Sequence, residues 1–219
     1  MDRFRNRHEA GIALAKKLII YAKKPDILVL ALPRGGVPVA YEIAKALTAP
    51  LDILIVRKLG VPGHQELAIG AIAADEICIF NETLKNSLHL SDSLINTVIK
   101  KEKKELQRRE SLYRHEMPPL SFINKTIILV DDGIATGATM LAALEIIAKG
   151  KAKQTIIATP VAAAATCKQF SKKVYDFVCL LKPIDFYAVG LWYDNFNQTT
   201  DEEVAELLKK ANQNGSINQ

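Results

Sequence analysis

The stretch from Thr126 to Met140 constrains the fold of this chain more than any other part of the sequence. It reads TIILVDDGIATGATM: an apolar run, two adjacent carboxylates, and small residues that lead into another apolar segment. This order predicts a buried strand, then a loop that enters a helix. The backbone N–H groups of such a loop, with the positive end of the helix dipole, favour a bound phosphate.

The two carboxylates in this stretch extend the same interpretation. Asp131 and Asp132 stand beside the predicted phosphate loop, where they could hold hydroxyl groups or a divalent cation. A phosphate and a polyol held side by side describe a sugar phosphate. The same residues would also fit a strand, an Asp-Gly turn and a helix without any ligand, an arrangement common in α/β proteins.

Apolar strands alternate with helical segments along most of the chain. Apolar runs predict strands at 27–32, 51–56, 126–130, 155–161 and 176–181. Helical spacing predicts helices at 8–21, 37–47, 91–114, 162–170 and 201–211, and one that ends at Lys149. Residues 59–65 contain Gly and Pro and predict a mobile loop, with short strands after it at 69–73 and 77–80. This alternation predicts a mostly parallel sheet with helices on both faces.

Four polar or glycine-containing segments follow predicted strands. They are Pro33-Arg34-Gly35-Gly36, Arg57-Lys58, Asp131-Asp132 with its loop, and the segment after Leu181. Ligands of open parallel sheets bind beyond the carboxyl ends of the strands, so we expect these segments to form one site. The sequence lacks GxxxxGK[ST] and GxGxxG, which argues against common nucleotide triphosphatases and dinucleotide-binding dehydrogenases.

Composition narrows the class of protein and its surroundings. The chain of 219 residues has a net charge of +5, which fits a site for polyanions or a mildly basic surface. The three cysteines are widely spaced, which is typical of reduced core residues in a cytoplasmic protein. The sequence has neither an apolar run long enough for a membrane span nor the apolar core of a signal peptide at its start. We therefore expect a cytoplasmic protein without a membrane partner.

The motifs carry a resemblance to a known family. ILVDDGIATGATM resembles the signature of the type I phosphoribosyltransferases, which bind 5-phosphoribosyl-1-pyrophosphate (PRPP). ALPRGG resembles the pyrophosphate loop of that family, and IVRK with the loop that follows resembles its third active-site loop. AVGLWYD, at 188–194, resembles the hood strand of the purine-salvage members. The resemblance covers roughly residues 27–195, with the helix at 91–114 as an insertion.

The resemblance implies a fold class and a domain organisation. We expect an α/β protein with a type I phosphoribosyltransferase-like core, its mostly parallel sheet flanked by helices, plus a small hood and an inserted charged helix. A single domain would span 1–211, with the helical insertion at 91–117. The hood would combine 182–197 with the N-terminal segment, and 212–219 would be a disordered tail.

The resemblance also implies a role for each matching residue. Catalytic roles fall to Asp131, Asp132, Arg57 and Lys58. The 5′-phosphate would bind to Ala135, Thr136, Gly137, Ala138 and Thr139, and the pyrophosphate to Arg34, Gly35 and Gly36. Trp192 and Tyr193 would contact the base, and Asp194 would bind Mg²⁺ as the metal cofactor. Ala135 stands where the 6-oxopurine enzymes carry an Asp, which argues against hypoxanthine or guanine as the acceptor.

The implied activity is transfer of 5-phosphoribosyl from PRPP to a small nitrogenous base with release of pyrophosphate, as in nucleotide salvage, by a homo-oligomer. The alternative is a regulatory protein that senses PRPP or a nucleotide without transferring it, with the basic helix 91–114 contacting nucleic acid. Aromatic residues are scarce in that helix and no nucleic-acid-binding motif is present, so the leading hypothesis does not include a nucleic-acid partner. Hydrolysis of a PRPP-like sugar is a third possibility.

Overall fold

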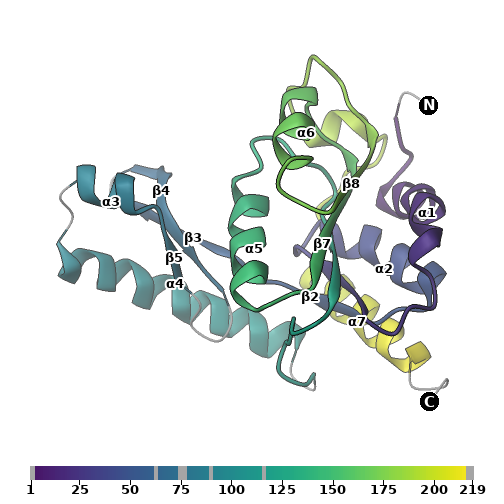
Figure 1. Cartoon of the computed structure of the whole chain (residues 1–219), viewed down its shortest axis with the longest axis horizontal. Coiled ribbons are helices and arrows are strands. Elements are labelled where there is room, and N and C mark those ends of the chain that lie inside the picture. The colour runs from purple at the N-terminus through teal and green to yellow at the C-terminus, as the bar shows by residue number, and fades with distance from the viewer. Residues whose placement is uncertain (1–2, 62–63, 74–77, 89–90, 115–116, 216–219) are drawn as a thin grey trace.

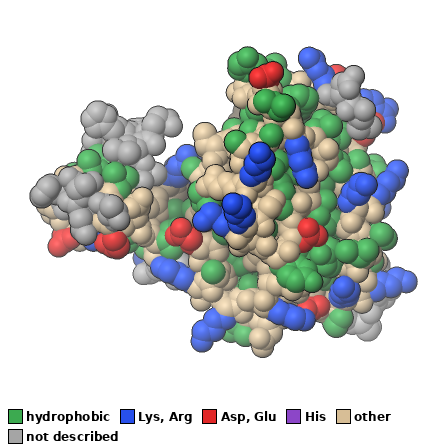
Figure 2. Space-filling model, turned by 45° about the horizontal axis from the view of Figure 1, so that its top comes forward, with side chains coloured by type: hydrophobic (Ala, Val, Ile, Leu, Met, Phe, Trp, Pro, Cys, Tyr) green, Lys and Arg blue, Asp and Glu red, His purple; other side chains and the backbone are tan. Residues whose placement is uncertain are grey.

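The protein consists of a body, built around a parallel sheet, and an arm that projects from one side of it (Figure 1). The computed structural model describes residues 3–61, 64–73, 78–88, 91–114 and 117–215. The body holds both termini and most of the helices, whereas the arm is formed by a continuous part of the chain between residues 57 and 113. Figure 2 shows the arm as a lobe that stands apart from the body.

Most of the helices and strands lie close to their predicted positions. The strands are β1 Ile27–Ala31, β2 Leu51–Ile53, β3 Arg57–Val61, β4 His64–Ile72, β5 Cys78–Phe80, β6 Thr126–Val130, β7 Gln154–Val161 and β8 Asp176–Leu181. The helices are α1 Arg7–Leu18, α2 Gly36–Leu47, α3 Glu82–Ser87, α4 Asp92–Tyr113, α5 Ala138–Lys149, α6 Ala164–Phe170 and α7 Asp201–Gly215. Short 3₁₀ helices span Ile19–Tyr21 and Val189–Trp192.

The central sheet has five strands in the order β2-β1-β6-β7-β8, and every neighbouring pair is parallel. Successive side chains of a strand point to opposite faces, so each strand contributes to two apolar layers. In β1, Val29 belongs to one layer, whereas Leu28 and Leu30 belong to the other. All five β1 residues are buried, which explains the continuous apolar runs in the sequence. The predicted parallel α/β core is confirmed.

Helices cover both faces of this sheet (Figure 1). Apolar side chains of α1, α2 and α7 pack in the layer that contains Val29. Those of α5 and α6 pack in the layer that contains Leu28 and Leu30. Because strand and helix alternate, the carboxyl ends of the parallel strands lie at one edge, where the connecting loops meet.

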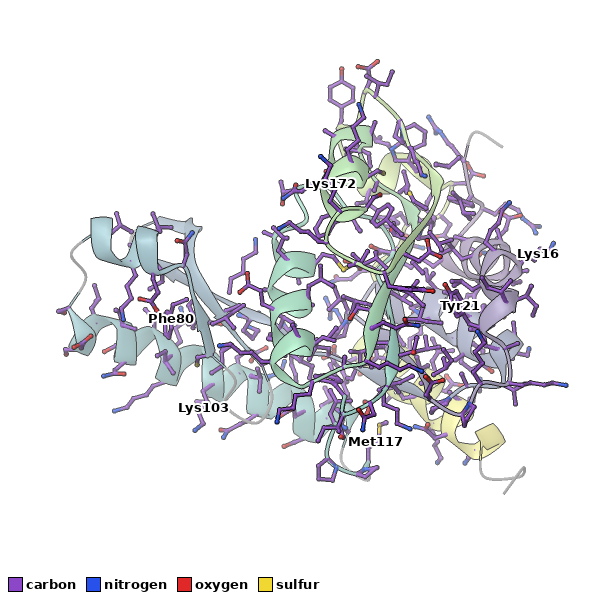
Figure 3. All side chains as sticks on the ribbon, viewed as in Figure 1. Lys16, Tyr21, Phe80, Lys103, Met117 and Lys172 are labelled. Atoms are coloured by element: carbon purple, nitrogen blue, oxygen red, sulfur yellow. The ribbon has the colours of Figure 1, made fainter. Side chains whose placement is uncertain are left out.

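The arm differs from the prediction for this region. Residues 57–61 and 64–72 form the antiparallel strands β3 and β4, with β5 as the third strand of a separate sheet, and not a loop over 59–65. The short strands predicted at 69–73 and 77–80 correspond to the end of β4 and to β5, which pair with each other. Leu59 and Val61, two residues apart, are both buried, and they pack against α4. Phe80 and Lys103 mark the arm in Figure 3, away from Tyr21 in the body.

Helix α4 joins the arm to the body. It begins after Ser91, whose hydroxyl accepts a hydrogen bond from the N–H of Leu94. At its other end, Arg114 donates to both carboxylate oxygens of Asp52, at 2.8 and 2.9 Å. Both side chains are only 10% exposed, so this ion pair fixes the end of α4 to β2.

Two segments near the C-terminus also differ from their predictions. The segment at 189–192, expected as a strand of the hood, is a 3₁₀ helix followed by a single bridge between Tyr193 and Phe4. Helix α7 continues through Gly215, so 212–215 extend the last helix, and 216–219 lie outside the described residues. Among the described helices, none combines the length and the apolar character that a membrane crossing requires.

Candidate active site

The glycine turn and the acidic pair are in direct contact at the carboxyl edge of the sheet. A Cβ atom added to Gly35 would lie 2.0 Å from Oδ2 of Asp132. A Cβ atom added to Gly36 would lie 2.7 Å from the carbonyl oxygen of Val130, at the end of β6. Only glycine permits this close approach, so the predicted pyrophosphate loop and the predicted ribose-binding acids share one surface. The peptide bond between Pro33 and Arg34 is cis.

The acidic pair lies in an environment that opposes ionisation. Burial raises the pKa of Asp131 well above its ordinary value, and the neighbouring charge of Asp132 raises it further. Burial also raises the pKa of Asp132, while the guanidinium of Arg7 acts in the opposite direction. The Nε of Arg7 donates to Oδ2 of Asp132 at 2.7 Å. The pair therefore binds protons or hydroxyl donors more readily than exposed carboxylates do.

The loop after the acidic pair has the form of an anion site. Gly137 has a φ of +74°, a conformation that favours glycine, and it caps the N-terminus of α5. In the described part of the chain, no protein acceptor takes the backbone N–H groups of Ala135 to Thr139. Ala135, Thr136 and Ala138 are exposed. These free amides at a helix N-terminus can hold a phosphate.

Helix α6 holds this loop in place from behind. The hydroxyl of Thr166 donates to the carbonyl oxygen of Ala135 at 2.9 Å. The ring of Phe170 lies so close to Gly137 that an added Cβ atom would be 2.5 Å from it. At the start of the loop, the N–H of Ile134 donates to the carbonyl oxygen of Val161 at 2.9 Å. The loop is therefore fixed on three sides, while Ala135, Thr136 and Ala138 remain exposed.

Arg34, next to the glycine turn, is held by the start of α7. Its Nη1 lies 3.3 Å from Oδ1 of Asp201. The same oxygen accepts a hydrogen bond from the hydroxyl of Tyr113, in the last turn of α4. These two donors hold the pKa of Asp201 below its usual range. A third of the Arg34 side chain is exposed, so the guanidinium can still bind an incoming anion.

Arg57 and Lys58 open β3, and no contact in the described residues joins them to the acidic pair. Arg57 pairs with Glu102 of α4 at 2.7 Å. Glu102 stands about three turns before Tyr113, roughly 16 Å along the helix axis. Lys58 is exposed. The predicted site cations are therefore divided: Arg34 directly precedes the glycine turn that contacts Asp132, whereas Arg57 is tied to the arm.

Residues 192–195 bond to the N-terminal segment, and the aromatic residues lie differently from their predicted roles. The N–H of Phe4 donates to the carbonyl oxygen of Trp192, and the N–H of Asp194 donates to that of Phe4. Tyr193 is buried between the rings of Phe4 and Phe196, and its hydroxyl donates to the carbonyl oxygen of Asp132 at 2.6 Å. Tyr193 thus supports the acidic pair. Its ring is buried against Phe4 and Phe196, so it offers no open face for the predicted contact with a base.

The indole of Trp192, the other predicted base contact, has a buried Nε1 without a hydrogen-bond partner among the described residues. Packing of the hood against the site depends on Val189, whose side chain would lie 2.3 Å from a Cβ atom added to Gly133. The hood therefore rests directly on the turn that follows the acidic pair.

The described residues contain no group of three or more His, Cys, Asp or Glu side chains that could hold a metal ion. Mg²⁺ is commonly bound by one or two carboxylates while substrate phosphates and water fill its remaining positions. The exposed carboxylate of Asp194 fits that limited role. The donor set is therefore compatible with a magnesium ion that arrives with a polyphosphate.

Sequence reasoning missed three residues of this site. Arg7, Thr166 and Asp201 each contact a predicted site residue from a distant part of the chain. None of them belongs to a motif, and their partners lie far away in the sequence, so no local pattern marks them.

Comparison with known proteins agrees with this geometry. A family model described as "Phosphoribosyl transferase domain" matches residues 4–194. The chain belongs to the phosphoribosyl transferase family. Two Mycobacterium tuberculosis proteins, provisionally named as phosphoribosyl transferases, are 42% identical to it over 211 residues. The match covers 96% of this chain and 47% of those proteins, so the chain spans about half the length of these curated relatives.

Solved structures share the fold of this chain. The crystal structure of TT1426 from Thermus thermophilus is 35% identical, with a TM-score of 0.84, and the match covers 95% of this chain and 98% of that one. AQ2163 from Aquifex aeolicus is 11% identical with a TM-score of 0.51, over 92% of this chain and 84% of that one, a likeness of fold alone.

Proposed function

We propose that this phosphoribosyl transferase family member transfers the 5-phosphoribosyl group from PRPP to a nitrogenous base and releases pyrophosphate. The observation that carries the proposal is the contact between the Gly35-Gly36 turn and Asp132, next to the amide loop that enters α5. The two carboxylates, as acceptors for ribose hydroxyls, would lie between two anion sites, one at the glycine turn and one at the amide loop. PRPP carries a phosphate at one end of its ribose and a pyrophosphate at the other.

The 5′-phosphate would bind to the free amides from Ala135 to Thr139, with the helix dipole of α5 behind them. Thr136 and Thr139 can add their hydroxyl groups. The rigid support of this loop by Thr166 favours a fixed ribose position. Such positioning lowers the entropic part of the barrier to transfer.

Asp131 and Asp132 would accept hydrogen bonds from the ribose 2′- and 3′-hydroxyls. When the bond between C1 and the pyrophosphate oxygen breaks, positive charge develops on the ribose ring. In their ionised form, the two carboxylates would stabilise this charge more strongly in a buried site than they would in water. The leaving pyrophosphate takes the bonding electrons and carries the matching negative charge.

The leaving group would be received by Arg34 and by the backbone of Gly35 and Gly36. Arg34 already pairs with Asp201 at 3.3 Å, so the pyrophosphate competes with this carboxylate for the guanidinium. Magnesium, when bound with the pyrophosphate, would supply further neutralisation of its charge. Asp194 is the candidate protein ligand for this ion. Arg57 and Lys58 would contribute if the arm moves toward the site.

The direct test is release of pyrophosphate from PRPP in the presence of Mg²⁺ and a panel of nitrogenous bases. We expect release with at least one base and little release without an acceptor. Release at the same rate without any base would instead indicate a hydrolase. A panel that is silent throughout, with a protein that does not bind PRPP, would reject the proposal.

A second candidate function, sensing of PRPP or a nucleotide linked to nucleic-acid binding, is favoured by one observation. Lys100, Lys101 and Lys104 are exposed on α4, which projects from the body with the arm. RNA or DNA binding that weakens with salt, and that is lost on neutralising these lysines, would support it. Absence of binding at low salt would remove it.

A further inference from the structure

The guanidinium of Arg7 occupies a buried position between the acidic pair and the hood. Its side chain is 11% exposed. Nε donates to Oδ2 of Asp132 at 2.7 Å, and Nη1 donates to the carbonyl oxygen of Asn197 at 2.8 Å. Its central carbon lies 3.9 Å from the centre of the Phe196 ring. Partners on three sides hold this planar cation in one orientation.

The position of Arg7 follows from the local sequence. The side chain of Asn6 accepts a hydrogen bond from the N–H of Glu9 at 2.9 Å, and the carboxylate of Glu9 accepts one from the N–H of Arg5 at 2.6 Å. The first bond caps α1, which starts at Arg7, and the second ties the residue before the cap to the first turn of the helix. The strand-like bonds of Phe4 to Trp192 and Asp194 then fix the same segment to the hood.

The hydrogen bond from Arg7 occupies Oδ2 of Asp132, so the second carboxylate oxygen, Oδ1, can accept a hydrogen bond from another donor. The backbone of Asp132 is fixed as well, because its carbonyl oxygen accepts from Tyr193 and its N–H donates to Oδ1 of Asp131 at 2.9 Å. With Gly35 against Oδ2, the carboxylate cannot rotate freely. A carboxylate held in this way presents a single acceptor in a defined direction.

We propose that Arg7 is a positioning residue of the ribose site, which holds the Asp132 carboxylate so that its second oxygen accepts a ribose hydroxyl. This inference rests on the proposed function, because it requires that ribose binds at the acidic pair. Arg7 acts through Asp132 and touches no substrate atom. It also makes the N-terminal segment part of the site, since Phe4 and Asn6 determine where the guanidinium stands.

A purely structural role for Arg7 predicts a different pattern. If Arg7 only ties the hood to the body, its removal weakens every ligand of the site by the same factor. If it orients Asp132, its removal weakens only those ligands whose hydroxyls Asp132 accepts. The two roles are separated by ligands that differ in the ribose hydroxyls alone.

The experiment measures binding of ribose 5-phosphate and of 2,3-dideoxyribose 5-phosphate by calorimetry. The variants are Arg7→Met, which keeps the apolar stem over Phe196, and Arg7→Lys, which keeps the charge. Arg5→Met is the matched control, because Arg5 lies on the same segment with an exposed side chain that pairs with Glu9. Circular dichroism checks that each variant is folded.

We expect Arg7→Met to weaken ribose 5-phosphate by about tenfold, the usual effect of losing a charged hydrogen bond. The dideoxy ligand should change less than about twofold, Arg7→Lys should give a smaller loss with the same selectivity, and Arg5→Met should leave both ligands unchanged. Equal losses for the two ligands in Arg7→Met would overturn the inference. If Arg7→Met fails to fold, equal losses in Arg7→Lys would do so.

The same data separate this inference from the proposed function. A wild-type protein that binds both ligands equally makes no use of the ribose hydroxyls, and this outcome rejects the ribose site together with the role of Arg7. A wild-type preference for the hydroxylated ligand, combined with a non-selective loss in Arg7→Met, rejects only the role of Arg7.

Discussion

Gly35 packs its backbone against the carboxylate of Asp132, so closely that a Cβ atom at position 35 would lie 2.0 Å from Oδ2 and 2.6 Å from Cγ. The turn proposed to hold pyrophosphate and the acid proposed to hold ribose therefore cannot move independently. In this arrangement, the geometry of one binding subsite depends on the sequence of the other.

The Gly35→Ala variant tests this dependence. The added methyl group must push the Asp132 carboxylate away or deform the turn, because neither neighbour can give way without losing its own contacts. We expect PRPP to bind at least about tenfold more weakly, with a loss of about 1–3 kcal/mol in the free energy of unfolding. Calorimetry and urea denaturation measure the two effects.

Gly150→Ala is a matched control for that variant. At Gly150, which caps the far end of α5, an added Cβ atom would lie 2.4 Å from the ring of Phe122. This variant should lose stability by a similar amount and retain the wild-type affinity for PRPP. Equal affinities in Gly35→Ala and the wild type would show that the contact has no effect on the site.

Removal of one partner from the buried ion pair between Arg114 and Asp52 should strongly destabilise the protein. Arg114→Met leaves the Asp52 carboxylate, 10% exposed, without its guanidinium, and we expect a loss of about 3–5 kcal/mol in the free energy of unfolding. Arg108→Met removes an exposed partner of Glu105 on the same helix and should cost about 1 kcal/mol or less. Urea denaturation of both variants compares the two pairs, and equal losses would contradict the assignment.

Deprotonation of the acidic pair should lower the free energy of unfolding of the protein as the pH rises. The folded-state pKa of Asp131 is raised above the ordinary value of 3.8, so the folded protein binds this proton more tightly than the unfolded chain does. Stability contributed by the protonated form is present below the unfolded pKa and is lost as the pH rises through the folded pKa. Asp131→Asn removes this loss, so its stability relative to the wild type should increase as the pH rises above the ordinary pKa of 3.8. A relative stability that falls as the pH rises would contradict the shift.

The hydrogen bond from Thr166 to Ala135 should support the phosphate loop. Thr166→Val keeps the shape of the side chain and removes the donor, so we expect ribose 5-phosphate to bind about three- to tenfold more weakly. Ser171→Ala removes a hydroxyl that donates to Cys167 within the same region, and it should leave affinity unchanged. Calorimetry with both variants decides whether the effect is specific to the loop.

The parallel core could be predicted because its signals are local. The apolar runs at Ile27–Ala31 and Thr126–Val130 are buried on both faces, so each strand can be recognised without reference to its neighbours. The glycine at position 137 likewise marks the loop before α5, because the positive φ found there favours glycine. The residues proposed to bind the substrate lie in the loops that follow these strands, so local patterns in the sequence mark where they stand.

The arm and the supports of the site could not be predicted in the same way. Residues 57–72 contain Gly60, Pro62 and Gly63, which are typical of loops, yet pairing with β5 and packing on α4 impose an antiparallel sheet. The contact between Arg7 and Asp132 joins residues 125 positions apart. A single arginine at the start of a helix carries no local signal of such a partner.

Calorimetric titration of the protein with PRPP and Mg²⁺ tests the central claim most directly. The wild-type protein should bind PRPP, and Asp131→Asn combined with Asp132→Asn should weaken binding at least about 100-fold, because two carboxyl groups that face the ribose hydroxyls are replaced by amides while the fold is kept. Wild-type affinity in a folded double variant would contradict the claim that this acidic pair holds the ribose.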